Sequence, residues 1–529
     1  MLDLGKTFLQ SAERSPNALA MVDGDIRWTY SEWLLRIGAL QRTLAQLGLK
    51  HGDHLVSVLQ NRQEAATLHW ACQFSGVVMT PLNWRAKPEE VQFALQDSAA
   101  KIVVYESISC AAVLQALIEF SKVIAVEIGC VDEANLTGLA TPQLTPIPYA
   151  DCISNLVEPV PFAHSDDLSL MLFTSGTTGL PKGVPRRHRA ERMAALAHVA
   201  QNQYGRSECT LGVMPLYHTM GVRSLLAMAL IDGCFICMHK FDAKQALANI
   251  ANERVSHLYL VPTLYHDLLA HPSFAKTDVR SVRRLGFAGA PMHDGLLLRL
   301  QDAFKPDLFV NHYGSSEIYT FSINPNAVGK PGSAGRAGIN TRLRVIKFDA
   351  KSTNDLAIPL EEGQIIADLA SEEAFESYHN RPDANAKSLR EGWYFTGDTG
   401  YVDAEGDLFV TGRVDDMIIS GGENISPVDI ESVISLHPAV DEVAVAGIKD
   451  ERWGQRVVAF VKYKHKVSSE ELDAHCRLSD LINFKRPREY VFVEEIPKSP
   501  VGKVLRRKLV AGDYSLTCGQ PDAPVLPPF

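Results

Sequence analysis

The chain has 529 residues, 46% of them hydrophobic and 22% charged, so it can bury large cores and is too long for one ordinary domain. Its formal net charge of -10 excludes the basic surface that binding to nucleic acid or to an anionic membrane requires. Nine scattered cysteines, an odd number, exclude a disulfide framework. We therefore expect at least two domains, and any phosphate must be bound by a local group of side chains.

Membrane and targeting signals are weak along the whole sequence. Apolar stretches such as 225–238 are interrupted by Asp232 and Gly233 and are too short to span a bilayer. Charged residues are scattered through the first 14 positions, which breaks any signal-peptide core. We expect a cytoplasmic protein without membrane insertion; the sequence is compatible with a homodimer but selects no oligomeric state.

From about residue 25 to 410, short runs rich in Val, Ile and Leu alternate with helical patterns. This alternation predicts an α/β fold in which mostly parallel sheets are covered by helices. The predicted strands are 54–59, 101–105, 123–126, 168–173 and 257–261. The run 233–238 contains a CxxC pair, Cys234 and Cys237, but its apolar neighbours indicate a buried strand and argue against redox chemistry.

A smaller unit follows the large one. Its pattern predicts a helix over 427–436 and strands over 440–448 and 456–463. The last stretch carries four of the 28 prolines and no periodicity, which is typical of a loose tail. The predicted organisation is a large N-terminal domain, a hinge, a small mobile C-terminal α+β domain and a tail, at residues 1–412, 413–416, 417–514 and 515–529.

The strongest local motif is Thr174-Ser-Gly-Thr-Thr-Gly-Leu-Pro-Lys-Gly183, directly after the predicted strand 168–173. Its three glycines, four hydroxyls and one lysine offer free N–H groups, side-chain donors and a cation, which suits polyphosphate. The order GxxxxGK[ST] is absent, so the loop is not a Walker A motif, and a simple surface turn is the weaker alternative. The candidate phosphate ligands are Thr174, Ser175, Gly176, Thr177, Thr178, Gly179 and Lys182.

With this loop the chain resembles the adenylate-forming superfamily of acyl-CoA synthetases, peptide-synthetase adenylation domains and beetle luciferases. Tyr313-Gly-Ser-Ser-Glu317 is similar to the family's YGxTE, with Ser316 in place of Thr. The resemblance implies that the ring of Tyr313 packs on adenine and that Glu317 helps to bind magnesium. The nucleotide-binding residues implied by this motif are Tyr313, Gly314, Ser315 and Ser316.

The same resemblance implies roles for further residues. Trp393-Tyr-Phe-Thr-Gly-Asp398 is similar to YxTGD, whose carboxylate accepts from both ribose hydroxyls, and Arg413 is implied at the same ribose. Asp415 matches the hinge position, and Lys503 matches the lysine that acts during adenylation. His218 matches a gating histidine between the nucleotide and the acyl pocket. Taken alone, Asp398 would be a turn residue and Lys503 a solvated lysine.

The sequence of the segments 412–425, 452–455 and 483–487 looks most like that of bacterial 4-chlorobenzoate:CoA ligases and their benzoate-type relatives. This resemblance implies a coenzyme A site in which guanidiniums pair with phosphates and aromatic faces line the pantetheine path. A surface arginine cluster with two packed aromatics is the alternative. The implied residues are Arg85, Gly421, Gly422, Trp453, Phe484, Arg486 and Arg488.

Position relative to the matched motifs also predicts the acyl pocket. Small residues at 288–290 leave room for a flat ring, and Met220 supplies an adaptable wall. Tyr319 and His312 add polar groups, which favours a benzoate-like, hydroxylated or heteroaromatic acid over chlorobenzoate. The predicted lining is Thr219, Met220, Ala288, Gly289, Ala290, Pro291, His312, Tyr319 and Thr320.

The sequence therefore predicts an AMP-forming ligase that uses ATP, Mg²⁺ and coenzyme A to activate a small carboxylic acid. A medium-chain fatty acyl-CoA ligase would need a uniformly apolar tunnel where Tyr319 and His312 stand. An adenylation enzyme that loads a carrier-protein thiol would not need the arginines of the implied coenzyme A site. An inactive binding protein could lose Glu317, Asp398 or Lys503, and all three are present.

Overall fold

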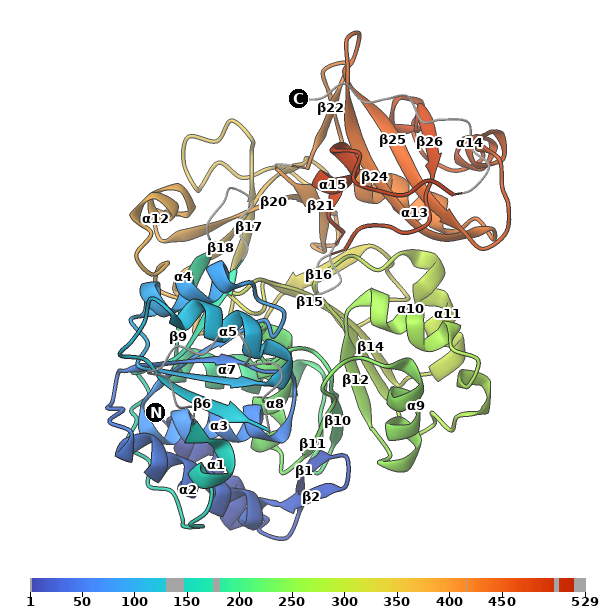
Figure 1. The fold of residues 1–529 in the computed structure, drawn as a ribbon. Helices are drawn as coiled ribbons and strands as arrows, with labels where there is room; N and C mark the ends of the chain where they lie inside the picture. The colour runs from blue at the N-terminus through green and yellow to red at the C-terminus, as the bar shows by residue number, and fades with distance from the viewer. Residues whose placement is uncertain (1, 130–146, 175–180, 415, 499–503, 518–529) are drawn as a thin grey trace.

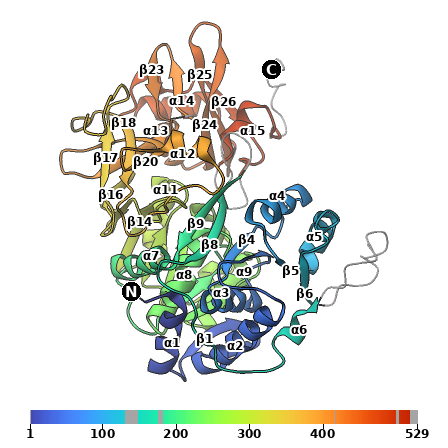
Figure 2. The same cartoon turned by 90° about the vertical axis from the view of Figure 1, so that its left-hand side faces the viewer.

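The computed structural model describes residues 2–129, 147–174, 181–414, 416–498 and 504–517. The N-terminal part contains two sheets that lie side by side and are accompanied by helices. The smaller C-terminal part contains a third sheet (Figure 1, Figure 2). Three predicted site residues or groups, Ser175–Gly179, Asp415 and Lys503, lie outside the described residues. In the described part of the chain, no helix combines the length and the apolar character that a membrane crossing requires.

The first sheet has seven strands in the order β7-β6-β5-β3-β4-β8-β9, parallel except for the antiparallel pair β8 and β9. Its central strands are buried on both faces, which explains why most of their residues are apolar. The strands are β3 His54–Val58, β4 Val78–Leu82, β5 Ile102–Glu106, β6 Ile124–Ile128, β7 Ile147–Pro148, β8 Leu168–Thr174 and β9 Lys182–Arg187. The helices of this region are α1 Leu4–Arg14, α2 Tyr30–Gln46, α3 Gln63–Ser75, α4 Pro88–Ser98, α5 Cys110–Leu117 and α6 Tyr149–Cys152.

The second sheet begins with the parallel strands β11, β10, β12, β13 and β14. They are β10 Cys209–Gly212, β11 Cys234–Cys237, β12 His257–Leu260, β13 Arg284–Phe287 and β14 Leu308–Tyr313, and the hairpin of β1 Leu19–Asp23 and β2 Ile26–Thr29 closes the edge. The accompanying helices are α7 His188–Gln201, α8 Thr219–Leu230, α9 Ala243–Asn252, α10 Pro262–Ala270 and α11 Asp294–Phe304. The strands predicted at 54–59, 101–105, 123–126, 168–173, 233–238 and 257–261 are confirmed to within two residues, and β11 is fully buried as expected.

Beyond β14 the same sheet continues as an antiparallel run, β15-β16-β21-β20-β18-β17. The strands are β15 Ser322–Asn324, β16 Ser333–Ala337, β17 Leu343–Ile346, β18 Gly363–Asp368, β19 Leu389–Arg390, β20 Trp393–Val402 and β21 Leu408–Arg413, with the short helix α12 Pro382–Ser388. Within the region for which mostly parallel sheets were predicted, this stretch is antiparallel. Several connections here are too short for the crossover that parallel neighbours need.

The small C-terminal sheet has the order β23-β22-β25-β24, with β26 paired to β25. Its elements are β22 Ile418–Ser420, β23 Glu423–Ile425, α13 Pro427–Ser435, β24 Val440–Asp450, β25 Gly454–Tyr463, α14 Ser469–Arg477, β26 Glu489–Phe492 and α15 Arg506–Val510. The predicted helix and both predicted strands are confirmed. In contrast to a loose tail, the backbone of 515–517 bonds to Phe492 and Glu494, while 518–529 lie outside the described residues.

The small part rests on α10 and α11 of the large part (Figure 1). α11 packs against α13, and the ring of His266 on α10 bonds to Asp441 at 2.9 Å. A Cβ on Gly295 would lie 2.9 Å from the carbonyl oxygen of Ser435, so the helices touch at a residue without a side chain. β22 and β25 extend from the opposite end of the small part, away from the large one (Figure 1, Figure 2).

Candidate active site

Three of the predicted nucleotide-binding side chains meet between the end of β14 and the paired strands β20 and β21. The hydroxyl of Tyr313 donates to Oδ2 of Asp398 at 2.5 Å, and Nη1 of Arg413 donates to Oδ1 at 2.9 Å. Asp398 and Arg413 are direct partners in the register of β20 and β21. Burial raises the pKa of the Tyr313 phenol well above its usual value, so it stays a donor.

Glycines permit the close packing at this point. A Cβ on Gly314 would lie 2.0 Å from the carbonyl oxygen of Tyr319, so the chain can turn back after β14 only without a side chain there. Gly397 has a φ of +75°, which L side chains rarely adopt, and its missing Cβ leaves room for the Arg413 guanidinium. The motif glycines therefore allow the close packing of Tyr313 and Arg413 around Asp398.

The predicted phosphate end lies at the start of β9. Lys182 is paired with Thr174 across β8 and β9, and its ammonium lies 4.7 Å from the centre of the Tyr378 ring. The Tyr378 hydroxyl donates to Oε1 of Glu317 at 2.6 Å. Burial lowers the pKa of Lys182 against the pull of the Glu317 carboxylate, and the nearby cations Arg381, Lys387 and Arg413 lower it further. Such a gathering of cations attracts a polyphosphate.

The buried Arg186 connects the predicted phosphate end with the predicted acyl pocket. Arg186 on β9 pairs with Glu191 at 2.7 Å, and both side chains are fully buried. Its Nη1 donates to the backbone oxygens of Glu317 and Glu373. Glu191 in turn accepts from the hydroxyl of Tyr319 at 3.1 Å. The Tyr319 hydroxyl is therefore bonded within the fold, although its position in sequence predicted a polar group facing the substrate.

The predicted acyl pocket begins at the N-terminus of α8. His218, the predicted gate, is the N-cap of this helix, and its Nδ1 accepts from the backbone N–H of Met220. Thr219 and Met220 are buried, and the Met220 sulfur would lie 3.8 Å from a Cβ on Gly289. Ala288 is buried on the same loop, Ala290 is half-buried, and Pro291 is exposed. The structure thus brings Met220 and the 288–290 segment together, with Pro291 at the outer edge.

Further along α8 lies a group of side chains that the sequence did not reveal. His198, Arg223, Tyr259 and His312 come from α7, α8, β12 and β14, and we call them the acyl-side polar cluster. All four are buried, and only His312 was among the predicted residues. One signal was available: Arg223 stands in the middle of a helix whose other residues are apolar or small. Tyr378 was missed as well, because no motif contains it.

The predicted coenzyme A residues fall into separate groups. The backbone N–H of Gly421 donates to the Trp453 carbonyl, and Arg488 lies 6.0 Å from the Trp453 ring. Gly422 follows in the same turn with a φ of +88°. Arg486 pairs with Asp473, and Phe484 is partly exposed.

The remaining member, Arg85, belongs to the large part of the chain, where it stacks on Trp84 at 3.7 Å. Gly421 lies in the turn between β22 and β23 and Trp453 in the turn between β24 and β25, at the end of the small part that lies away from the large part (Figure 1). This orientation therefore separates Arg85 from the small-part residues.

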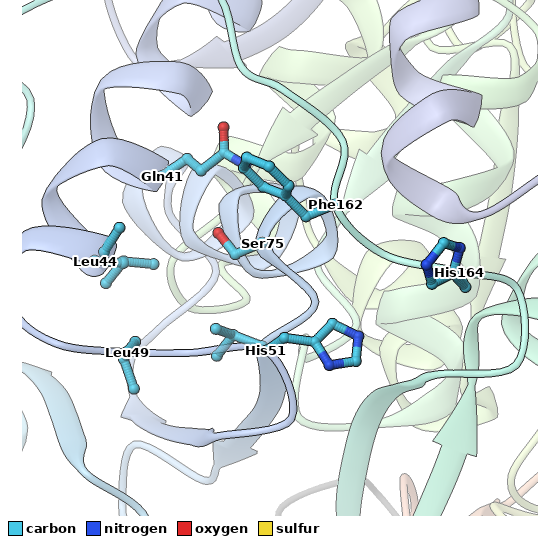
Figure 3. A pocket seen from close by; sticks show the side chains of 9 residues that line it. Gln41, Leu44, Leu49, His51, Ser75, Phe162 and His164 are labelled. Carbon is cyan, nitrogen blue, oxygen red and sulfur yellow. The ribbon is translucent and has the colours of Figure 1, made fainter.

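A cavity of about 460 Å³ lies elsewhere, between α2, the end of α3 and the segment around residue 162 (Figure 3). Phe162 and Gln41 cover one side, and His51 and His164 stand at another, where His51 bonds to Asp167 (Figure 3). None of the predicted site residues lines it. The cavity is therefore separate from the candidate active site.

A metal could be held in one place that suits the predicted reaction. Mg²⁺ is commonly bound by one or two carboxylates together with substrate phosphates, and the buried Glu317 beside Lys182 fits that donor set. The acidic group Asp403, Glu405 and Asp407 is a different case, because the ammonium of Lys330 bonds to all three. That position is occupied by the chain's own cation.

Two family models match the chain in agreement with these two parts. The AMP-binding enzyme family matches residues 8–372, and the AMP-binding enzyme C-terminal domain matches residues 429–503. The first match includes the phosphate loop and the Tyr313 to Glu317 motif, and the second ends at Lys503.

Individual proteins are similar over almost the entire length. A 4-chlorobenzoate–CoA ligase from an Arthrobacter species is 33% identical over 506 residues, which cover 94% of this chain and 93% of the relative. A long-chain fatty acid–CoA ligase from Mycobacterium tuberculosis is 32% identical over 525 residues, covering 98% and 99%. The structure of o-succinylbenzoate CoA synthetase from Bacillus subtilis with its acyl-adenylate intermediate superposes with a TM-score of 0.78 at 26% identity, covering 95% of this chain and 97% of that one. These similarities confirm the predicted α/β fold class with a large N-terminal and a smaller C-terminal domain.

Proposed function

Because the chain belongs to the AMP-binding enzyme family and is an acid–thiol ligase, we propose that it adenylates a small aromatic acid with ATP and transfers the acyl group to coenzyme A. The observation that carries this proposal is the arrangement around Asp398. Both oxygens of this carboxylate are held in fixed directions by Tyr313 and Arg413, beside the cations near Lys182. A nucleotide bound there has its ribose at Asp398 and its phosphates at Lys182.

In the first half-reaction, a carboxylate oxygen of the acid attacks the α-phosphorus of ATP and pyrophosphate leaves. The negative charge that moves onto the leaving group is stabilised by Lys182 and the preceding loop, and by Lys503 as the sequence predicts. Glu317 is the residue that would hold Mg²⁺, which supplies additional charge stabilisation at the phosphates when bound. Tyr378 positions Glu317 through its 2.6 Å hydrogen bond. Positioning and electrostatics supply most of the rate enhancement.

In the second half-reaction, the thiol of coenzyme A attacks the acyl carbonyl and AMP leaves. Gly421, Trp453 and Arg488 would need to approach the nucleotide site, and in this structure the turns that hold Gly421 and Trp453 lie at the far end of the small part. The small domain therefore has to rotate about the predicted hinge at Asp415 between the two half-reactions. The contact between His266 and Asp441 belongs to the first arrangement.

The acyl end favours an aromatic acid over a fatty acid. A fatty acyl chain requires a long apolar path, whereas α8 carries the buried Arg223 one turn after Met220. The charge of a buried guanidinium is costly to place against a hydrocarbon chain. A flat ring between Met220 and Gly289 meets this polar wall at one end only. Cytoplasmic location and a homodimer stay predictions.

The function is tested by incubating the protein with ATP, Mg²⁺, coenzyme A and single acids, and by measuring AMP and acyl-CoA together. The panel contains benzoate, hydroxybenzoates, furoate, cinnamates and medium-chain fatty acids. Acyl-CoA formation with the aromatic acids is expected. Activity with chain acids alone would assign a fatty acyl ligase, and AMP release without acyl-CoA would point to a different thiol acceptor.

A further inference from the structure

The acyl-side polar cluster is a compact group of four side chains around one ring. The Tyr259 ring lies 4.6 Å from His198 and 5.1 Å from His312, and the two histidine rings lie 5.3 Å apart. The Cζ of Arg223 lies 5.1 Å from the Tyr259 ring, and Nη2 of Arg223 donates to the Tyr259 hydroxyl. Four elements that are far apart in sequence thus place two imidazoles and a guanidinium side by side.

Asn202 defines which nitrogen of each histidine carries a proton. Its Nδ2 donates to the backbone oxygen of His198 at 2.7 Å, and a carbonyl can only accept, so the amide orientation is determined. The same Nδ2 donates to Nδ1 of His198, which leaves the proton of that ring on Nε2. Oδ1 of Asn202 accepts from Nε2 of His312, which leaves a lone pair on Nδ1 of that ring. Burial lowers the pKa of both histidines well below the usual value, so both rings are neutral.

The second nitrogen of each ring has no hydrogen-bond partner among the residues that the structure describes. Nε2 of His198 and Nδ1 of His312 are buried and lack a hydrogen bond to any described residue. The same holds for Nε of Arg223. Buried polar atoms are nearly always hydrogen-bonded, and leaving one without a partner is costly. The cluster therefore presents two unused donors and one unused acceptor.

Arg223 lacks the partner that buried arginines usually have. Its side chain is 2% exposed, yet no carboxylate of the described residues lies within ion-pair distance. Its Nη1 donates to Oγ1 of Thr320 at 2.9 Å and to the backbone oxygen of Tyr319 at 3.3 Å. Arg186 offers the contrast, because it is equally buried and pairs directly with Glu191. The hydrogen bonds of Arg223 thus go to neutral groups, while the buried carboxylate of Glu373, whose pKa the Arg223 charge lowers against the effect of burial, lies beyond ion-pair distance.

The cluster lies next to the predicted acyl pocket. Arg223 follows Met220 by one helical turn on α8, so both side chains point to the same face of the helix. His312 directly precedes Tyr313 on β14, so the two side chains point to opposite faces of the strand, with Tyr313 bonded to Asp398 and His312 in the cluster. Met220, Ala288 and Tyr259 also belong to one packed group of buried side chains, which joins the predicted acyl pocket to the cluster.

We propose that the acyl-side polar cluster recognises a hydroxyl group on the ring of the substrate acid. The N–H groups of Arg223 and His198 donate to the hydroxyl oxygen, and the hydroxyl donates to Nδ1 of His312. A hydroxyl is the small substituent that satisfies all three atoms, because it accepts twice and donates once. A second carboxylate would leave the His312 lone pair without a donor, and a chlorine or methyl would leave all three unsatisfied. This inference rests on the proposed ligase function.

The first test changes the substrate and leaves the protein intact. Benzoate is compared with the 2-, 3- and 4-hydroxybenzoates and with the chloro, methoxy and amino analogues of the preferred position, measuring kcat/KM for acyl-CoA formation. One hydroxybenzoate is expected to exceed benzoate and its chloro analogue by about 100-fold. The methoxy analogue, which cannot donate, and the amino analogue, which accepts poorly, are expected between these limits.

The second test removes one member of the cluster at a time. Arg223→Met is expected to reduce the preference for the hydroxybenzoate over benzoate to less than about threefold, and His198→Phe to reduce it about tenfold. Arg284→Met is the matched control, because Arg284 lies on β13 and pairs with Glu208 outside the cluster. The control is expected to keep the wild-type preference. Should Arg223→Met fail to fold, His198→Phe carries the test.

The outcomes separate the two proposals. Equal kcat/KM for benzoate, chlorobenzoate and all hydroxybenzoates would overturn the recognition of a hydroxyl while leaving the ligase function intact. A clear preference for a dicarboxylic acid, or a hydroxyl preference that survives both substitutions, would also overturn it. AMP release from none of the acids would instead refute the proposed function.

Discussion

The nucleotide end and the acyl end of the candidate active site differ in whether their buried polar side chains have hydrogen-bond partners. At the nucleotide end, Asp398 is bonded by Tyr313 and Arg413, and Glu317 by Tyr378. At the acyl end, Arg223, His198 and His312 each keep one buried polar atom without a partner among the described residues. The first region is organised before any ligand arrives, whereas the second is completed by whatever group binds there.

This difference tells where the specificity of the enzyme resides. A prearranged site lowers the cost of binding a ligand whose chemistry never changes, as is the case for ATP. Unsatisfied buried groups penalise every acid that lacks the matching substituent. The two ends should therefore respond differently to substitution, with changes at Asp398 affecting all acids equally and changes at Arg223 altering their ranking.

The largest effect is expected from a substitution of Arg186, the buried residue that connects the two ends. Arg186→Met leaves Glu191 buried without its partner and frees the backbone oxygens of Glu317 and Glu373, so we expect a loss of about 3–5 kcal/mol in the free energy of unfolding. Arg187→Met is the matched control on the next residue, because Arg187 pairs with Glu376 at the surface. The control should cost no more than about 1 kcal/mol. Denaturant unfolding measures both, and equal losses would contradict the special role of the buried pair.

The second effect is confined to the nucleotide end. Asp398→Asn removes the charge that Arg413 and Tyr313 hold in place, so kcat/KM for ATP in pyrophosphate exchange should fall about 100-fold. The ranking of benzoate and hydroxybenzoates should stay as in the wild type. Asp278→Asn, in an exposed pair with Arg280, serves as the control and should keep full activity. A changed ranking of acids in Asp398→Asn would break the distinction between the ends.

The nucleotide end could be predicted from the sequence to a greater extent than the acyl end. The nucleotide end is encoded in short contiguous motifs, so the sequence alone points to Tyr313, Glu317, Asp398 and Arg413. The acyl-side polar cluster draws single residues from positions 198 to 312, and only His312 stands beside a motif. The partners within the cluster are defined by tertiary packing, which local patterns cannot express.

The fold shows the same limit. Buried parallel strands were predicted because most of their residues are apolar, as in β3 and β5. The antiparallel run from β15 to β21 was missed because its strands are short and half-exposed, as in β17 and β21, and mimic the alternation of the preceding region. The organisation into a large domain, a hinge and a small domain stays a prediction in its boundaries.

A smaller effect tests how firmly the nucleotide end is prearranged. Tyr378→Phe removes the hydrogen bond to Glu317 and keeps the ring that lies against Lys182, so we expect about a tenfold loss in kcat/KM for ATP. The apparent affinity for Mg²⁺ should fall as well, because Glu317 loses its orientation. Tyr401→Phe is a suitable control on β20, since its ring stacks on Phe409. An unchanged dependence on Mg²⁺ in Tyr378→Phe would show that Glu317 is positioned by other contacts.

The smallest effect concerns the contact that holds the small domain against the large one. Hydrogen bonds to Asp267 and Asp441 raise the pKa of His266 to about 9, and the His266 bond lowers the pKa of Asp441 to about 2. Because the histidine pKa is raised above its usual value near 6.5, its stabilisation is complete below that pH and is lost as the pH rises through about 9. Asp267 lies on the same helix, so only the Asp441 share depends on the domain contact.

His266→Gln should therefore weaken the domain contact by about 1 kcal/mol near pH 6.5 and by almost nothing near pH 10. The measurement is the rate of limited proteolysis between the domains, followed from about pH 6 to about pH 10 in the wild type and the variant. The wild-type rate should rise across this range toward the rate of the variant, which should vary less. His271→Gln, whose ring bonds to the backbone of Ser273, is the control and should follow the wild type. Parallel pH profiles for wild type and His266→Gln would mean that the domain contact does not depend on this charge, and the rotation between half-reactions would then have to be opposed by other contacts, such as the packing of α11 against α13.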